Sequence, residues 1–176
     1  TVVCLLTLFF VTLCAMEKQV INLYIKTYGK TPENVCRLSG AGSNRAYFRL
    51  FADGESVIGC VGTSTVENAT FIYMSRHFEG CGLPVPHVIS VSDDGVCYLQ
   101  EDLGGDSLYD LISVGRKLGG KYNDDEVKLL EKTIALLPDM QFKGAEGFDF
   151  SQCYQCREMD EDCVRFDLNY FKYCYL

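Results

Sequence analysis

Residues 38–50 combine the side chains and the turn that a phosphate-binding hairpin needs. The segment reads Leu-Ser-Gly-Ala-Gly-Ser-Asn-Arg-Ala-Tyr-Phe-Arg-Leu, so a glycine-rich turn separates two short segments of alternating polarity. Glycine lets a backbone approach a phosphate closely, and the exposed amides of a turn bind anions. Arg45 can add a charge-assisted hydrogen bond. The segment predicts a hairpin that lies against a phosphate chain, and a plain hairpin turn is the alternative.

The ten cysteines are the second group of residues that could do chemistry. Cys60 and Cys97 lie inside apolar runs, where cysteine behaves as a small hydrophobe, so we expect reduced, buried thiols in a reducing compartment. Cys153 and Cys156 have the spacing of metal ligands, but no second pair or histidine follows at a suitable distance. A structural zinc ion needs four ligands, so we expect no metal site.

Composition limits the partners. The formal net charge of −8 argues against nucleic acid, because phosphate backbones select basic surfaces. The length of 176 residues suits one domain or slightly more, and 48% hydrophobic residues allow a sizeable core.

Residues 1–15 are strongly apolar and carry no charge. They are shorter than the roughly 20 residues that span a bilayer, and a signal peptide would begin with basic residues. We expect that Met16 is the natural start, that residues 1–15 are not native, and that the protein has no membrane partner. A genuine export signal is the alternative. A secreted cysteine-rich domain would require that signal and oxidised thiols.

Hydrophobic periodicity predicts the elements that position these residues. Helices are expected at 16–28, from Ser64 or Thr65 to 79, and at 108–114, 123–137 and 160–176. Strands are expected at 35–39, 46–51, 56–62, 87–91 and 96–100. The strand signals fade after Gly104 and Gly105, so the composition changes near residue 102. The sequence therefore predicts an α+β fold, with a five-stranded antiparallel sheet and one helix followed by helices only.

This order resembles the small lobe of the protein-kinase-like fold and, within it, the aminoglycoside phosphotransferase and choline kinase family. The chain looks most like the bacterial kinases of N-acetylmuramate and N-acetylglucosamine. Four segments carry the resemblance: 42–50, the helix from Glu67, Gly-Leu-Pro-Val-Pro at 82–86, and Tyr-Leu-Gln-Glu-Asp-Leu-Gly at 98–104. The match covers about residues 35–112.

The resemblance implies roles for individual residues. The nucleotide-positioning loop would consist of Gly40, Ala41, Gly42, Ser43, Asn44 and Arg45. The adenine-binding hinge would consist of Gln100, Glu101, Asp102 and Leu103. Glu67 would be the helix acid that pairs with a lysine on the third strand. That strand contains no lysine, and Gly59 or Cys60 stands in its place. Arg45 or Arg49 would then supply the positive charge, or the lobe binds nucleotide weakly.

The catalytic residues of phosphoryl transfer are missing from the sequence. The chemistry needs a catalytic aspartate, an asparagine about five residues later and a metal-binding aspartate beyond. Asp167 is followed by Asn169, which is too close, and Lys172 occupies the required position. Asp149 opens a triplet that resembles a metal-binding one, but nothing catalytic precedes it. We therefore expect no catalytic residue and no metal ligand in this chain, although the class remains that of a phosphotransferase.

These observations and the resemblance together predict an organisation and a function. Residues 1–15 form a leader, 16–101 the small lobe with an N-terminal helix, 102–105 a hinge, and 106–176 the start of an incomplete helical lobe. We expect an N-terminal fragment of a cytoplasmic sugar or aminoglycoside kinase that binds ATP and is inactive alone. Magnesium ligands and the sugar-like acceptor would belong to the missing part. The alternative is a non-catalytic nucleotide- or protein-binding pseudokinase module.

The C-terminal helix allows two expectations. Its apolar residues look like core positions, and Asp167 looks solvated. The helix nevertheless has no obvious partner within the chain, so we expect the isolated chain to associate through it. The core-like positions are Leu168, Tyr170, Phe171 and Tyr175.

Overall fold

The computed structural model describes residues 2–39, 45–154 and 159–175, with the backbone alone for residues 2–12 and 175. The predicted turn residues 40–44 lie outside this description. The strands are β1 (Asn34–Arg37), β2 (Ala46–Ala52), β3 (Glu55–Val61), β4 (Val88–Val91) and β5 (Cys97–Glu101). The helices are α1 (Val2–Tyr28), α2 (Thr65–Gly80), α3 (Leu108–Leu111), α4 (Ser113–Lys117), α5 (Asp124–Phe142) and α6 (Glu161–Tyr175), with a 3₁₀ turn, η1 (Phe150–Gln152).

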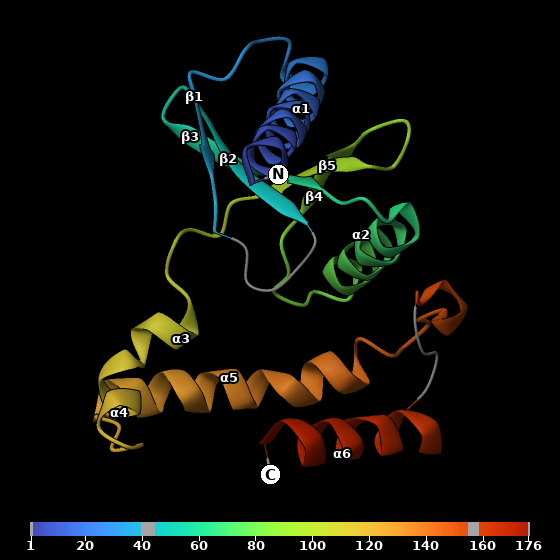
Figure 1. Cartoon of the computed structure of the whole chain (residues 1–176). Helices are drawn as coiled ribbons and strands as arrows, with labels where there is room; N and C mark the ends of the chain where they lie inside the picture. The colour runs from blue at the N-terminus through green and yellow to red at the C-terminus, as the bar shows by residue number, and fades with distance from the viewer. Residues whose placement is uncertain (1, 40–44, 155–158, 176) are drawn as a thin grey trace.

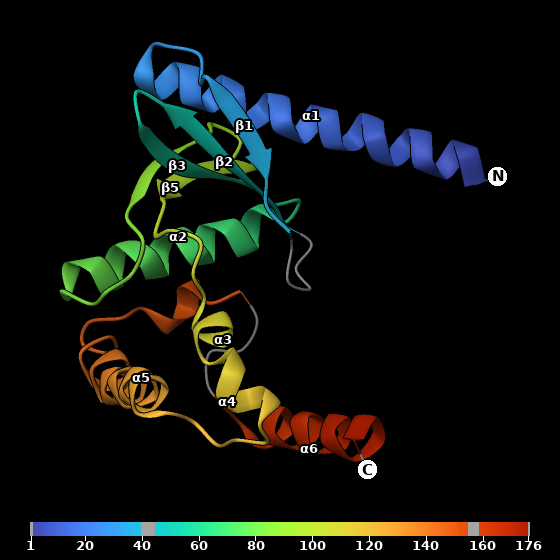
Figure 2. The ribbon, with the colours of Figure 1, turned by 90° about the vertical axis from the view of Figure 1, so that its left-hand side faces the viewer.

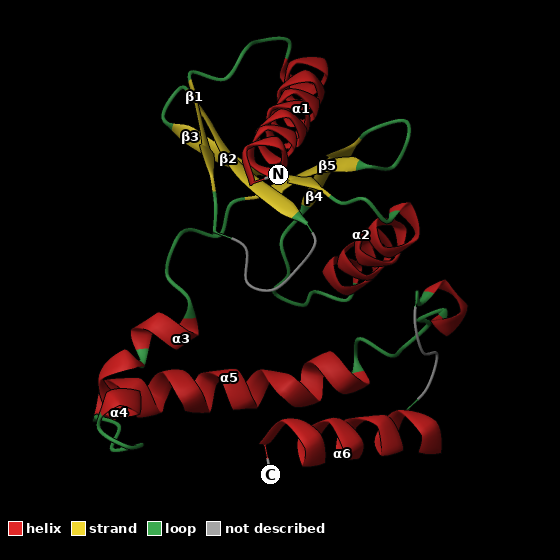
Figure 3. Cartoon of the chain, viewed as in Figure 1, coloured by secondary structure: helices red, strands yellow, loops and turns green. Residues whose placement is uncertain are grey.

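The five strands form one antiparallel sheet in the order β1-β2-β3-β5-β4. Helix α2 connects β3 to the edge strand β4, and β5 returns to the centre beside β3. This confirms the predicted fold class, a five-stranded antiparallel sheet with helices. Figure 1 shows α1 and α2 on opposite sides of the sheet, and Figure 3 shows that the chain after the sheet is helical.

Helix α1 covers one face of the sheet. Val20, Leu23 and Tyr24 are buried against Phe48 and Leu50, which belong to the alternating buried positions of β2. Alternation places successive side chains of a strand on opposite faces, so the even-numbered residues of β2 face α1 and the odd-numbered ones face α2. In Figure 2 the N-terminal part of α1 extends past the edge of the sheet. Among the described residues, no helix combines the length and the apolarity needed to cross a membrane.

Helix α2 covers part of the opposite face. Cys60, Tyr98 and Ile72 form a second buried cluster, with Phe71 and Tyr47 packed around it. Ser64 caps the helix, as predicted, by accepting a hydrogen bond from the backbone N–H of Glu67. The centroids of the Phe71 and Tyr98 rings lie 5.2 Å apart in a stacked arrangement.

The structure corrects several predicted boundaries. Helix α1 begins at Val2 rather than at residue 16, because the uncharged run before Met16 contains nothing that ends a helix. The helix predicted at 108–114 consists of two short helices, α3 and α4, which join at Ile112. Helix α5 continues past Pro138 to Phe142, although its end was predicted at residue 137.

The prediction that the apolar residues of the last helix form a core is wrong. Leu168, Tyr170 and Phe171 are 63%, 57% and 53% exposed, whereas Asp167 is exposed as expected. The total exposed area is 12353 Å². A compact protein of 176 residues exposes about 8,600 Å². The difference reflects helices that project from the sheet and apolar faces without cover.

Gly59 on β3 permits the close packing of α1, which makes it a sensitive site for mutation. A Cβ atom at Gly59 would overlap Val20 and lie 3.0 Å from Leu50, whereas a Cβ at Gly80 would meet nothing within 4 Å. We predict that Gly59→Ala lowers the free energy of unfolding by about 2 kcal/mol. The control Gly80→Ala, near the end of α2, should be neutral or stabilise by about 0.5 kcal/mol. Urea denaturation measures both, and equal effects would contradict the packing argument.

Candidate functional site

Three predicted site residues lie on the α2 side of the sheet or beside it, Arg45 and Glu67 level with the start of β5 and Asp102 beyond its end. Arg45 directly precedes β2, Glu67 lies in the first turn of α2, and Asp102 follows β5. By alternation, Arg45 and Arg49 share the face of β2 that Tyr47 presents to α2. Gln100 likewise shares the face of β5 that buries Tyr98. Residues 55 positions apart in the sequence therefore lie on one face of the sheet.

Arg45 pairs with Glu67. Its Nη2 atom lies 3.0 Å from Glu67 Oε1 and donates a hydrogen bond of 3.2 Å to the Glu67 carbonyl oxygen. The guanidinium also lies over the Phe71 ring, 5.4 Å from the centroid. The Arg45 side chain is 14% exposed, and that of Glu67 is 42% exposed. Of the two arginines considered as replacements for a third-strand lysine, Arg45 is the one that contacts Glu67.

Arg49 instead holds the linker that follows β5. Its Nε and Nη2 atoms donate to the two carboxylate oxygens of Asp102 at 2.6 and 2.9 Å, and Nη2 also donates to the Gly104 carbonyl at 2.8 Å. The Ser56 hydroxyl donates to the same carboxylate at 2.6 Å, and the Gly104 N–H donates at 2.9 Å. We call Arg49, Ser56, Asp102 and Gly104 the linker clamp. It joins β2, β3 and the chain that leaves the sheet.

The linker clamp determines the ionisation of Asp102, whose side chain is 6% exposed. Burial alone would raise the pKa of this carboxyl group. The hydrogen bonds from Arg49, Ser56 and the Gly104 N–H outweigh burial and hold the pKa below its ordinary value. The carboxylate is therefore ionised at neutral pH, and the bidentate pair is strong.

Contacts within the fold already use several polar groups of the predicted hinge. The backbone N–H of Glu101 donates to the His87 carbonyl at 2.9 Å, so strand pairing already uses this donor. The Asp102 carboxylate is engaged in the linker clamp. Leu103 is 69% exposed beyond the end of β5.

Cys60 is one of the two residues, with Gly59, that stand where the resemblance would place a lysine. The residue is completely buried below α2, and burial raises the pKa of its thiol, so the thiol is neutral at physiological pH. Burial also raises the pKa of Cys97, on the α1 side, to about 12. Both belong to the buried thiols that the sequence predicted. No disulfide joins the cysteines whose side chains the structure describes.

Sequence reasoning missed one structural residue of the site, Asn68. This fully buried side chain donates from Nδ2 to the carbonyls of Gly62, Gly95 and Val96, at 2.9–3.2 Å. It therefore ties α2 to the end of β3 and to the turn between β4 and β5. The available signal was its spacing, because residues 68, 72 and 75 form one helical face and all three are buried.

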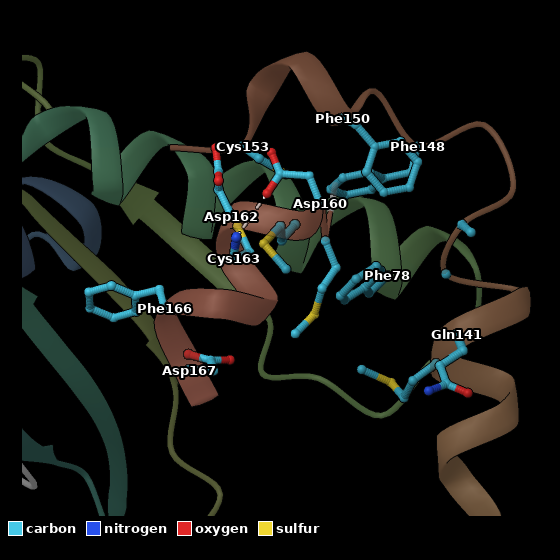
Figure 4. Close-up of a pocket in the computed structure, with 15 residues that line it drawn as sticks. Phe78, Gln141, Phe148, Phe150, Cys153, Asp160, Asp162, Cys163, Phe166 and Asp167 are labelled. Atoms are coloured by element: carbon cyan, nitrogen blue, oxygen red, sulfur yellow. Dashed lines mark hydrogen bonds between the residues drawn. The ribbon is translucent and has the colours of Figure 1, made fainter. Parts of the chain in front are cut away.

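A cavity of about 930 Å³ lies away from the predicted site. It is bounded by α2, the end of α5, the segment around Phe148 and the start of α6. Figure 4 shows Phe78, Phe148 and Phe150 around it, with Asp160 just before α6 and Asp162 and Asp167 on α6. No predicted site residue lines it. Within the described part of the chain, no three His, Cys, Asp or Glu side chains cluster closely enough to hold a metal ion.

Comparisons with known proteins give a fold-level likeness only. No protein-family model matches the chain, and no curated protein matches it. The chain is similar to solved structures of a thermostable mutant of aminoglycoside phosphotransferase APH(4)-Ia. The ternary complex with AMP-PNP and hygromycin B has a TM-score of 0.42 and 21% identity, and the apo form has a TM-score of 0.43 and 20% identity. Each alignment covers 55% of this chain and 33% of the phosphotransferase chain. This chain therefore spans about a third of the length of the solved structures.

The linker clamp should make the free energy of unfolding depend on pH. The folded pKa of Asp102 is depressed, so its stabilisation is complete above the unfolded pKa of about 3.9 and is lost as pH falls through the folded value. Asp102→Asn should lower the free energy of unfolding by about 2–3 kcal/mol at pH 7. The deficit relative to wild type should shrink below about pH 4.

Urea denaturation between pH 3 and 7 measures this difference. Asp125→Asn is the matched control, because Asp125 is 91% exposed and pairs only with the exposed Lys128 in the described contacts. A constant deficit for Asp102→Asn at every pH would show that the carboxylate charge is not what stabilises the linker.

Proposed function

We propose that this chain is the ATP-binding small lobe of a small-molecule phosphotransferase of the sugar or aminoglycoside kinase type. One observation carries the proposal. Arg45, predicted to approach the phosphates, and Gln100, predicted to approach the base, are 55 positions apart and share the α2 face of the sheet by strand alternation. In the sequence, the predicted glycine turn comes directly before Arg45.

The charges at this face suit a nucleotide. Arg45 is held by Glu67 just before β2 begins, and the linker is held by Arg49 in the middle of β2. An ion pair between a strand cation and a helix acid is a recurring part of kinase sites, and a linker after a sheet provides backbone groups for the base. In this proposal Gly40, Ala41, Gly42, Ser43 and Asn44 contact the phosphates.

In this proposal, the lobe itself binds neither the phosphate acceptor nor a metal ion of its own. The sequence contains no aspartate and asparagine at the spacing that phosphoryl transfer requires, so this chain binds ATP without transferring phosphate. Magnesium would arrive bound to the nucleotide. A sugar-like hydroxyl compound is the acceptor class that we propose for the whole protein, in a cytoplasmic setting that suits its reduced thiols.

Nucleotide mapping tests the proposal. We expect ATP to bind with a dissociation constant on the order of 0.1–1 mM, because one lobe supplies only part of a site. Amide chemical shifts should change at residues 38–50 and 100–104. The amides of α5 serve as the internal control and should not move. The proposal is wrong if ATP binds nowhere, or if the shifts gather around the cavity lined by Phe148.

A protein-binding module is the second candidate, and the exposed face of α6 favours it. Phe166, Leu168 and Tyr173 are 70%, 63% and 76% exposed on a helix of 15 residues. Monomeric proteins rarely expose apolar patches of this kind, and such patches mark interaction sites.

Sedimentation velocity tests whether this face drives association. We predict that the wild-type chain self-associates at micromolar concentrations and that Phe166→Glu with Tyr173→Glu shifts it toward monomer by about tenfold or more in concentration. Glu161→Gln with Asp162→Gln, on the exposed polar part of the same helix, is the control and should leave association unchanged. Association that is insensitive to both pairs would place the interface elsewhere.

A further inference from the structure

Neither of the two β3 residues that stand where a lysine would be expected can carry a cation into the site. Gly59 faces α1, where a Cβ atom would overlap Val20. Cys60 faces α2 and is completely buried in the cluster with Ile72 and Tyr98. A lysine at either place would have to displace a helix or lose its charge, because a buried ammonium group is strongly disfavoured.

Arg45 brings a positive charge to the same end of α2 by another route. It stands immediately before β2, and its guanidinium reaches the first turn of α2 to contact both the carboxylate and the carbonyl of Glu67. Phe71, one turn further along α2, lies beneath the guanidinium. These contacts come from two directions and fix the orientation of the side chain.

We infer that Arg45 is the residue that distinguishes nucleoside di- and triphosphates from nucleosides, in place of a lysine on β3. Glu67 is the positioning residue for it. The inference rests on the proposed function, since it assigns the phosphate-reading role within that site. A guanidinium has five N–H donors in a planar fork that matches phosphate oxygens, so it can bind phosphate while it keeps a carboxylate partner.

A purely structural role for Arg45 makes a different prediction. If Arg45 only ties β2 to α2, its loss distorts the whole face and lowers the affinity for every ligand of the site equally. If Arg45 reads phosphate, its loss weakens ATP and ADP but leaves adenosine unchanged. The ratio of ATP to adenosine affinity therefore separates the two roles, and overall stability does not.

The experiment compares ATP, ADP and adenosine by ligand-observed NMR titration on the full chain. We expect Arg45→Met to raise the dissociation constant of ATP by about 10- to 100-fold, the usual effect of losing a charged hydrogen bond. The dissociation constant of adenosine should stay within about twofold of the wild-type value. Arg45→Lys should retain part of the ATP affinity because it retains the charge. Glu67→Gln should cause a smaller loss than Arg45→Met.

Arg116→Met is the matched control. Arg116 also lies over an aromatic ring, that of Tyr109 at 3.2 Å, and donates to a backbone carbonyl, but it belongs to α4, away from the sheet. The Arg116→Met variant should bind ATP, ADP and adenosine with wild-type affinity. Equal losses of ATP and adenosine in Arg45→Met, or no loss of either, would overturn the inference and leave the proposed function standing.

Failure of the proposed function looks different. If the wild-type chain binds neither ATP nor adenosine, then the face is not a nucleotide site, and the role of Arg45 falls with it. Because the wild-type titrations come first, this result is separated from the failure of Arg45 alone.

Discussion

The bidentate pair between Arg49 and Asp102 is the contact on which the arrangement of the chain depends. It forms where β2, β3 and the departing linker meet, and it satisfies a carboxylate that is almost fully buried. Breaking one partner of such a pair is costly, because the other charge is left desolvated. The pair therefore fixes where the chain leaves the sheet, and with it the starting direction of the segment that leads to α3 and α5.

Helix α2 provides the second connection between the sheet and the later helices. Its first turn carries Glu67 against Arg45, and its later turns carry Tyr73 and His77. The Tyr73 hydroxyl accepts a hydrogen bond from the Asp149 N–H at 2.7 Å, and the ring of Phe148 lies 5.1 Å from the rings of both Tyr73 and His77. One rigid helix thus contacts the candidate phosphate side at one end and the C-terminal segment at the other.

The sequence was sufficient for the elements whose signals are local. Strand β2 alternates buried and partly buried residues along its whole length, and Ser64 has the chemistry of a helix cap, so both were predictable. The antiparallel pairing of the strands followed from the hairpin turns, whereas the order of the strands in the sheet was not predicted. The turn at 40–44 remains a prediction, because these residues lie outside the described part of the chain.

The parts that failed depend on distant contacts. Arg49 and Asp102 are 53 positions apart, and nothing in their types distinguishes this pair from other opposite charges. A proline inside a helix normally kinks or ends it, yet α5 continues past Pro138 to Phe142. The chain just after α5 contacts α2, where His77 Nε2 lies 3.0 Å from the Gly144 carbonyl oxygen. The apolar residues of α6 have the periodicity of a core helix, but periodicity does not say whether a partner surface is present.

The two buried thiols have a consequence for the study of internal motion. Cys60 lies under α2 and Cys97 under α1, so each is shielded by a different layer. A thiol reagent would reach each one only when its own helix lifts, whereas exposed Cys36 on the edge strand would react at once. The natural chain thus carries a separate chemical reporter for the opening of each side of the sheet.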